Sequence, residues 1–221
     1  MLDSFRRSFA SAYEGVVRAI RDELDLEPTG RPAKSTTSIT EKLLRERIRL
    51  TQMQDIAGCR VIVADISTQG RVVQHLIQRF PRHAVIDRRG RPSHGYRAVH
   101  IVVTSEGKQV EIQIRTDLQH RWAELSEKFS DVVDPSIKYG GGKDWIRSLL
   151  SQMSTVIAAV ELREQELGGV WQPPIPPPVA FRLAGAEDAA KIAEAQQNLA
   201  SARRELAEVL ERAKALAERR A

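Results

Sequence analysis

The stretch from Ser93 to Arg115 reads S-H-G-Y-R-A-V-H-I-V-V-T-S-E-G-K-Q-V-E-I-Q-I-R and decides the fold. It begins as a glycine turn and continues as a strand, a short turn at Glu106-Gly107 and a second strand. In the second strand apolar residues alternate with polar ones, and a period of two sends the two sets to opposite faces. The hairpin over residues 97–114 must be antiparallel, because its loop is too short for a crossover.

The two faces of the second strand differ in chemistry. The apolar members, which must lie on a core, are Val110, Ile112 and Ile114. The polar members, a carboxylate, an amide and a guanidinium in a row, are Glu111, Gln113 and Arg115. This order favours a functional site on the polar face, and a sheet face that only meets solvent is the alternative.

Length and charge bound the class of protein. The chain has 221 residues, which fits one domain plus an appendage. Its formal charge of +5 and pI of about 9.6 favour polyanionic partners such as nucleotides or nucleic acid, with a plain basic surface as the alternative. The single cysteine, Cys59, excludes an internal disulfide. It sits in the apolar run A-G-C-R-V-I-V, which predicts a buried, unreactive thiol.

Several functional classes are excluded by missing patterns. The sequence has no apolar run of about 18 residues and no signal-peptide pattern, so we expect a cytoplasmic protein without a membrane partner. It has no zinc-ligand spacing, no G-x-x-x-x-G-K-S/T phosphate loop and no G-x-G-x-x-G fingerprint.

The remaining elements follow from periodicity and breaker residues. Helices are predicted over residues 3–24, from Ser35–Ser38 to about Leu50, and over 67–80, 116–129 and 144–163. Strands are predicted at Cys59–Ala64 and His83–Asp87. Residues 26–32 are expected only to break the chain between helices. The loop over 134–143 contains Gly140, Gly141 and Gly142 and is expected to be a mobile lid or a linker.

The C-terminal part separates from the rest by composition. Residues 168–184 contain W-Q-P-P-I-P-P-P and are predicted to be a proline-rich connector. Residues 185–221 are predicted to form one helix with two heptad seams. The seams are Ile192, Leu199, Leu206 and Ala213, and Ala195, Ala202, Val209 and Leu216. The first interpretation is a coiled coil or helical hairpin that joins protomers of a homo-oligomer; packing against its own domain is the alternative.

Cations cluster around the second predicted helix. Arg31 and Lys34 precede it and Lys42 lies within it. Because helix N-termini attract anions, two cations beside one favour a phosphate cradle, with a solvated basic face as the alternative. Asp55 lies just before the strand at Cys59, where it could cap the strand or bind a ligand.

Four ordered motifs together resemble the synthetase domain of the RelA/SpoT family, the (p)ppGpp synthetases. They are G-R-P-x-K…S-I-x-x-K (30–42), D-I-A-G-C-R-V-I (55–62), G-Y-R-A-V-H (95–100) and E-I-Q-I-R-T-x-x-x-H-x-x-A-E (111–124). The resemblance covers roughly Gly30 to Tyr139. It implies an α/β (α+β) fold with a nucleotidyltransferase-like mixed β-sheet flanked by helices, to which the chain adds a C-terminal helical extension. Residues 1–167 would form this domain, with the motif core over 30–139, in a stand-alone small synthetase.

The resemblance also implies an activity and residue roles. The activity is transfer of pyrophosphate from ATP, with Mg²⁺, to the ribose 3′-hydroxyl of GDP or GTP, making (p)ppGpp. Asp55 and Glu111 would hold Mg²⁺, and Glu111 would assist deprotonation of the attacking hydroxyl. The cations implied to bind the ATP triphosphate are Arg31, Lys34, Lys42 and Arg115. His100 would bind the acceptor's phosphates or ribose. Tyr96 would stack on the acceptor base, with packing on the core as the alternative.

The loop before Tyr96 departs from the family pattern, which usually resembles D-Y-I-x-x-P-K-x-N-G-Y. Here it reads D-R-R-G-R-P-S-H-G-Y, one residue shorter. Arg89 or Arg91 would replace the usual lysine, and His94 stands where the asparagine would be. The sequence therefore leaves more than one acceptor substrate to consider. One alternative is the same chemistry on the 3′ end of tRNA or on an adenine nucleotide, as in toxin-like relatives; another is a catalytically silent nucleotide- or RNA-binding module.

Overall fold

The computed structural model describes residues 2–169 and 181–218, which fall into two compact units. The first unit contains Met1–Ala64, Thr68–Arg91 and Arg97–Thr116. The second contains Asp65–Ser67, Pro92–Tyr96 and Asp117–Ala221. Each unit has its own hydrophobic core, and each is described by itself.

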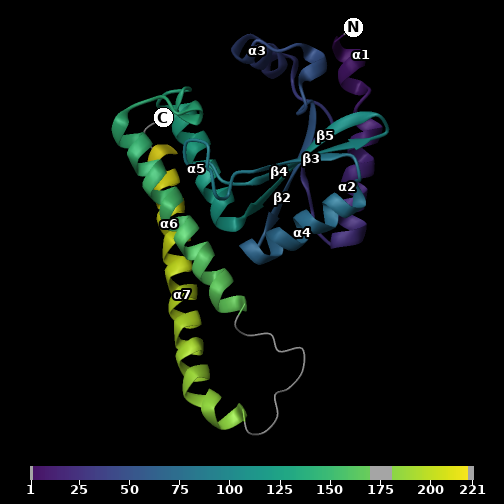
Figure 1. The fold of residues 1–221 in the computed structure, drawn as a ribbon. Helices are drawn as coiled ribbons and strands as arrows, with labels where there is room; N and C mark the ends of the chain where they lie inside the picture. The colour runs from purple at the N-terminus through teal and green to yellow at the C-terminus, as the bar shows by residue number, and fades with distance from the viewer. Residues whose placement is uncertain (1, 170–180, 219–221) are drawn as a thin grey trace. The chain divides into compact units, whose positions relative to one another are not determined.

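The first unit is built on a five-stranded sheet (Figure 1). Its strands are β1 (Thr29–Arg31), β2 (Ala57–Val63), β3 (His83–Asp87), β4 (Val99–Ser105) and β5 (Lys108–Thr116). They lie in the order β1-β2-β5-β4-β3, with β2 and β5 parallel and the other pairs antiparallel. The predicted mixed sheet and the antiparallel hairpin are confirmed. The hairpin turn places Glu106 and Gly107 at φ of 48° and 73°, the left-handed region that two-residue hairpin turns use.

Two helices, α2 (Ala10–Leu24) and α4 (Ile66–Arg79), cover the apolar face of this sheet. The first unit also contains α1 (Leu2–Arg7), α3 (Thr36–Glu46) and the 3₁₀ turn η1 (Leu50–Gln52). Val16 and Ile20 of α2 and Leu76 of α4 are buried in one cluster with Ile112 and Ile114 of β5. The alternation in β5 therefore sends its apolar set into the core, as predicted.

The first two predicted helices have different bounds in the structure. The helix predicted over 3–24 is divided into α1 and α2 at Ser8 and Phe9. Ser35 caps α3 as predicted, since its hydroxyl accepts a hydrogen bond from Ser38 N at 3.2 Å. The helix ends at Glu46 rather than near Leu50, because Arg47 turns left-handed with φ of 52°.

Strand β1 is an element that the sequence interpretation missed. Residues 26–32 do more than break the chain, because Gly30 pairs with Cys59 of β2. A Cβ at Gly30 would lie 2.6 Å from the Cys59 Cα and closer still to the Gly58 carbonyl oxygen. Glycine at position 30 therefore allows a close approach of backbones rather than a turn.

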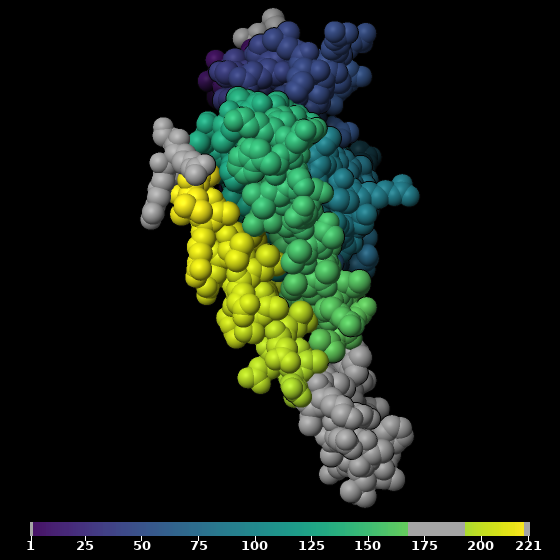
Figure 2. All heavy atoms as spheres, turned by 90° about the vertical axis from the view of Figure 1, so that its left-hand side faces the viewer, coloured from purple at the N-terminus to yellow at the C-terminus, as the bar shows by residue number. Residues whose placement is uncertain are grey.

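The second unit is helical. It contains α5 (Asp117–Val132), the 3₁₀ turn η2 (Ile137–Tyr139), α6 (Asp144–Gly169) and α7 (Phe181–Glu218). Figures 1 and 2 show α6 and the later part of α7 side by side. Ion pairs tie α7 to its neighbours: Arg203 with Glu164 of α6 at 2.6 Å, and Lys214 with Glu124 of α5 at 3.0 Å.

The two heptad seams of α7 differ in burial. Leu206 and Ala213 of the first seam pack on the core of the second unit, together with the buried Leu210 and Ala217. Val209 and Leu216 of the second seam are 49% and 60% exposed. The described part of the tail thus packs within its own unit, as the alternative interpretation has it, and Val209 and Leu216 of the second seam lie on its surface.

The proline-rich connector falls largely outside the described residues. Residues 170–180 carry no structural description, while α6 extends to Gly169 and α7 begins at Phe181, four residues before the predicted start. Within the described residues, no helix is both long enough and apolar enough to cross a membrane.

The glycine-rich loop before α6 is a packed segment. Gly140 and Gly142 both have φ of 84°, which side-chain-bearing residues rarely adopt. A Cβ at Gly140 would run into the His94 ring, and one at Gly142 into the Ile137 side chain. Glycine is therefore required at both positions, because the backbone has positive φ and a side chain would collide with a neighbour.

Candidate functional site

The polar face of the sheet carries a hydrogen-bonded row along β5. Glu111 accepts from Gln113 Nε2 at 2.9 Å, and Gln113 accepts in turn from Arg115 Nη2 at 3.0 Å. His100 on β4 brings its Nδ1 to 2.9 Å from the other Glu111 oxygen. The residues that alternate with the apolar set thus form one connected chain of side chains.

Glu111 is held as a carboxylate. Burial by itself raises the pKa of Glu111, but hydrogen bonding and charge from His100, with the Gln113 amide, outweigh burial and bring its pKa below the ordinary 4.5. The negative charge of Asp55 also acts on Glu111 and raises its pKa. The two carboxylates therefore lie near enough to influence one another.

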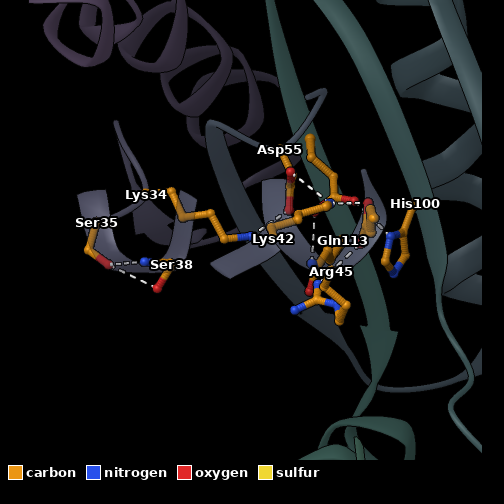
Figure 3. Close-up of polar contacts among 10 residues, drawn as sticks. Lys34, Ser35, Ser38, Lys42, Arg45, Asp55, His100 and Gln113 are labelled. Carbon is orange, nitrogen blue, oxygen red and sulfur yellow. Dashed lines mark hydrogen bonds and ion pairs between the residues drawn. The ribbon is translucent and has the colours of Figure 1, made fainter. Parts of the chain in front are cut away.

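Asp55, just before β2, is gripped by two lysines (Figure 3). Lys34 Nζ lies 2.6 Å from Asp55 Oδ2, and Lys42 Nζ of α3 lies 2.9 Å from Oδ1. Burial raises the pKa of Asp55, and hydrogen bonds from both lysines more than offset it, so its pKa is lowered. The Lys34 backbone is fixed because its N–H donates to Ile56 O at 2.7 Å.

A hollow of about 420 Å³ collects these groups, and we call it the polar hollow. Its lining is Thr29, Gly30, Arg31, Lys34, Asp55, Ile56, Gly58, Cys59, Arg60, Glu111 and Gln113. Four predicted site residues thus line one space, and they are Arg31, Lys34, Asp55 and Glu111. Three others contact lining residues: Lys42 contacts Asp55, His100 contacts Glu111, and Arg115 contacts Gln113. Arg115, predicted to bind phosphate, is only 4% exposed.

Arg60 is a lining residue that the sequence interpretation did not single out. The register pairs Arg60 of β2 with Gln113 of β5 on one side and with Thr29 of β1 on the other, so it shares their face. The period of two in A-G-C-R-V-I-V was a usable signal, because it separates Gly58 and Arg60 from the buried Cys59 and Val61.

Cys59 fits the predicted buried, unreactive thiol. Its thiol is buried, and burial together with the Glu111 charge raises its pKa to about 12. A thiol with that pKa stays protonated at neutral pH and is a poor nucleophile.

The arginines of the loop after β3 are not gathered at the polar hollow's lining. Arg89 grips Asp87, with Nη2 at 2.5 Å from Oδ2, and this hydrogen bonding lowers the pKa of Asp87. Arg91 is exposed. Neither residue is among those that line the polar hollow.

Tyr96 belongs to the second unit. Ser93 and Tyr96 close a turn with two backbone hydrogen bonds of 3.2 and 2.9 Å. The Tyr96 ring packs on the core of the second unit, and its centroid lies 6.5 Å from the centroid of the Trp122 ring. Gly95 has φ of 92°, and a Cβ there would lie 2.6 Å from the Trp122 ring. A smaller hollow of about 120 Å³ adjoins Tyr96 and Trp122.

His120 and Glu124 lie one turn apart on α5, with 3.7 Å between His120 Nε2 and Glu124 Oε1. Glu124 also pairs with Lys214 of α7. Within the second unit this carboxylate therefore links two helices.

The donor set of the polar hollow fits Mg²⁺ bound together with phosphate. Mg²⁺ in nucleotide sites is commonly held by one or two carboxylates and completed by phosphate oxygens and water. Asp55 and Glu111 supply two carboxylates to one space. Among the residues that the structure describes there is no cluster of three or more His, Cys, Asp or Glu that could hold a metal alone.

Solved structures with a similar fold include small alarmone synthetases. The small alarmone synthetase 1 from Bacillus subtilis, bound to its product pppGpp, matches with a TM-score of 0.58 and 25% identity over 76% of this chain and 98% of that one. The same protein bound to AMPCPP matches with a TM-score of 0.50 and 24% identity, over 74% and 95% of the two chains.

Sequence comparison identifies a family region within the chain. Residues 30–130 match the model described as a region found in RelA/SpoT proteins. The chain therefore carries a RelA/SpoT synthetase region in the fold of the small alarmone synthetases, which confirms the resemblance of the four motifs.

Two curated relatives set the limits of this match. An uncharacterized protein of Mycobacterium tuberculosis is 36% identical over 145 residues, 63% of this chain and 50% of that protein. The GTP pyrophosphokinase of Haemophilus influenzae is 27% identical over 170 residues, 71% of this chain and 22% of that protein. The chain thus spans half or less of the length of these relatives.

Proposed function

We propose that this protein is an ATP-dependent pyrophosphokinase that moves the β,γ-pyrophosphate of ATP to the ribose 3′-hydroxyl of GDP or GTP. The observation that carries the proposal is the polar hollow, where Asp55 and Glu111 face the same space as a group of cations. Phosphoryl-type transfer depends mainly on positioning and charge neutralisation, and these side chains supply both.

The residues divide into cations that bind the phosphate donor, ATP, and a carboxylate that accepts the proton. The triphosphate of ATP is bound by Arg31, Lys34 and Lys42, with Arg115 supporting Gln113 behind the lining. The acceptor 3′-oxygen attacks the β-phosphorus, the bond from that phosphorus to the α,β-bridging oxygen breaks, and AMP leaves. The proton of the 3′-hydroxyl passes to the Glu111 carboxylate, whose lowered pKa keeps it ionised at neutral pH.

Asp55 and Glu111 would hold Mg²⁺, which when bound offsets the negative charge that develops on the phosphate oxygens. His100 positions Glu111 through their 2.9 Å contact and reaches toward the acceptor. Tyr96 stacks on the acceptor base. The homologue structures with pppGpp and AMPCPP support a nucleotide acceptor and a nucleotide donor.

The direct test is a transfer assay with γ-labelled ATP and Mg²⁺. Separate reactions contain GDP, GTP, ADP and bulk tRNA, and Glu111→Gln is the control. Label on GDP or GTP, lost in Glu111→Gln with the fold retained, supports the proposal. Label on tRNA or ADP alone shows the same chemistry on another acceptor. No transfer by protein that still binds nucleotide would make the chain a binding module and end the proposal.

A further inference from the structure

In the structure both oxygens of Asp55 are engaged by ammonium groups. Lys34 and Lys42 lie 2.6 and 2.9 Å from Oδ2 and Oδ1, and Figure 3 shows both lysines beside Asp55. The side chains of Lys34, Lys42 and Asp55 are only 19%, 21% and 16% exposed, respectively. Salt screens such a partly buried group weakly, so the ammoniums compete strongly with any cation for this carboxylate.

The second carboxylate is also engaged. One Glu111 oxygen lies 2.9 Å from His100 Nδ1, and the other accepts from Gln113 Nε2 at 2.9 Å. A divalent cation that entered alone would have to displace protein donors from both residues. It would also meet a positive field, because Arg31 and Arg60 line the same hollow.

We infer that Lys34 and Lys42 keep the metal site closed until a nucleotide arrives, so that the divalent cation enters with the triphosphate and not before it. This inference rests on the proposed function, since it assigns regulation to the same site. The lysines hold Asp55 in the free protein and transfer to phosphate oxygens when the triphosphate binds. Asp55 is thereby released for the metal.

The side chains are suited to this exchange. A lysine carries a point charge on a flexible four-carbon stem, so its ammonium can move while its backbone stays fixed. The Lys34 backbone is held at both ends, by its N–H to Ile56 O and by Arg6 Nε donating to its carbonyl at 2.7 Å. Lys42 has a second partner within reach, Glu46 Oε2 at 3.8 Å.

The inference predicts opposite effects on two ligands. Mn²⁺ serves as the probe for Mg²⁺, and its binding to the full, nucleotide-free chain is measured by the loss of the free Mn²⁺ resonance signal. In Lys42→Met, and separately in Lys34→Met, Mn²⁺ should bind roughly tenfold more tightly or better, because a neighbouring positive charge is lost. The same variants should bind AMPCPP more weakly. Adding Asp55→Asn to either variant should abolish the gain in Mn²⁺ affinity.

Arg31→Met is the matched control, because it removes a cation from the same hollow that makes no described ion pair with Asp55. It should weaken AMPCPP binding and leave Mn²⁺ affinity closer to wild type. Unchanged Mn²⁺ affinity in a folded lysine variant, or an equal gain in Arg31→Met, would overturn the inference. Failure of wild type to bind AMPCPP even with Mn²⁺ present would instead count against the proposed function. Thermal melts of each variant identify any that fail to fold, and the two lysines are tested independently.

Discussion

At the scale of single residues, the site depends on how buried carboxylates are held ionised. Burial alone would raise the pKa of both Asp55 and Glu111, yet each has a lowered pKa. Two lysines achieve this for Asp55, and His100 with Gln113 achieves it for Glu111. In the proposed reaction Glu111 is the general base and must be a carboxylate, so we expect the partner that keeps it ionised to set the acid limit of the rate.

Replacement of that partner gives the first prediction. In His100→Ala the burial of Glu111 and the charge of Asp55 remain, and both raise its pKa. The acid limb of kcat/KM against pH should therefore move to higher pH, because the partner that lowered the pKa of Glu111 is lost. The position of the limb is the readout, whatever the loss in maximal rate.

His75→Ala is the control, since His75 lies on α4, on the apolar side of the sheet, and pairs with Glu23 at 2.9 Å. It should leave the acid limb where wild type has it. An unmoved limb in His100→Ala would mean that the rate does not follow the ionisation of Glu111.

At the scale of elements, β1 carries more than its three residues suggest. It adds an edge to the sheet beside β2 and leads directly from Arg31 to Lys34, so it places two of the cations that line the polar hollow. Its antiparallel register requires glycine at position 30, where a Cβ would collide with the backbone of β2. Rigid backbone cannot give way as a flexible side chain can.

Gly30→Ala should therefore lower the free energy of unfolding by about 1–3 kcal/mol and weaken AMPCPP binding, because β1 must shift away from β2. Urea denaturation and nucleotide titration measure the two effects. Gly70→Ala is the matched change: it lies within α4 with nothing within 4 Å of the added Cβ. It should stabilise the protein by about 0.5–1 kcal/mol through helix propensity. Equal behaviour of the two variants would contradict the close-approach account.

At the scale of the whole molecule, the C-terminal helix α7 has two apolar stripes, one buried and one exposed. One stripe, containing Leu206 and Leu210, is buried against the second unit's own core. The other, containing Val209 and Leu216, remains about half exposed or more. The buried stripe accounts for folding of the unit, and the exposed stripe is where contact between protomers is expected.

The double variant Val209→Glu, Leu216→Glu should lower the solution mass measured by light scattering, because charges would face each other across a protomer contact. The fold should survive, since neither residue is buried. Gln197→Glu with Ala200→Glu adds acidic groups at exposed positions off both seams and should leave the mass unchanged. Equal masses for wild type and the seam variant would remove the coiled-coil interpretation.

The sequence by itself determined the elements whose periodicity is strong and local. Alternation in Val110–Arg115 defined the two faces of β5, and the short turn at Glu106-Gly107 required an antiparallel hairpin. The ordered motifs brought Asp55, Glu111 and their cations into one hypothesis, and the structure places four of the predicted residues around one hollow. These features depend on residues close in sequence or on motif order, which a single chain displays directly.

Other features were decided only by tertiary structure, because they depend on contacts between segments far apart in sequence. The sequence around Gly30 indicated a chain break, and only its pairing with β2 shows why glycine is required there. Arg60 is identified as a lining residue only by its register with Gln113. The heptads could not tell which stripe of α7 faces α5 and α6. The lysine grip on Asp55 likewise arises because β1, α3 and the start of β2 meet in space, and burial there makes charge pairing favourable.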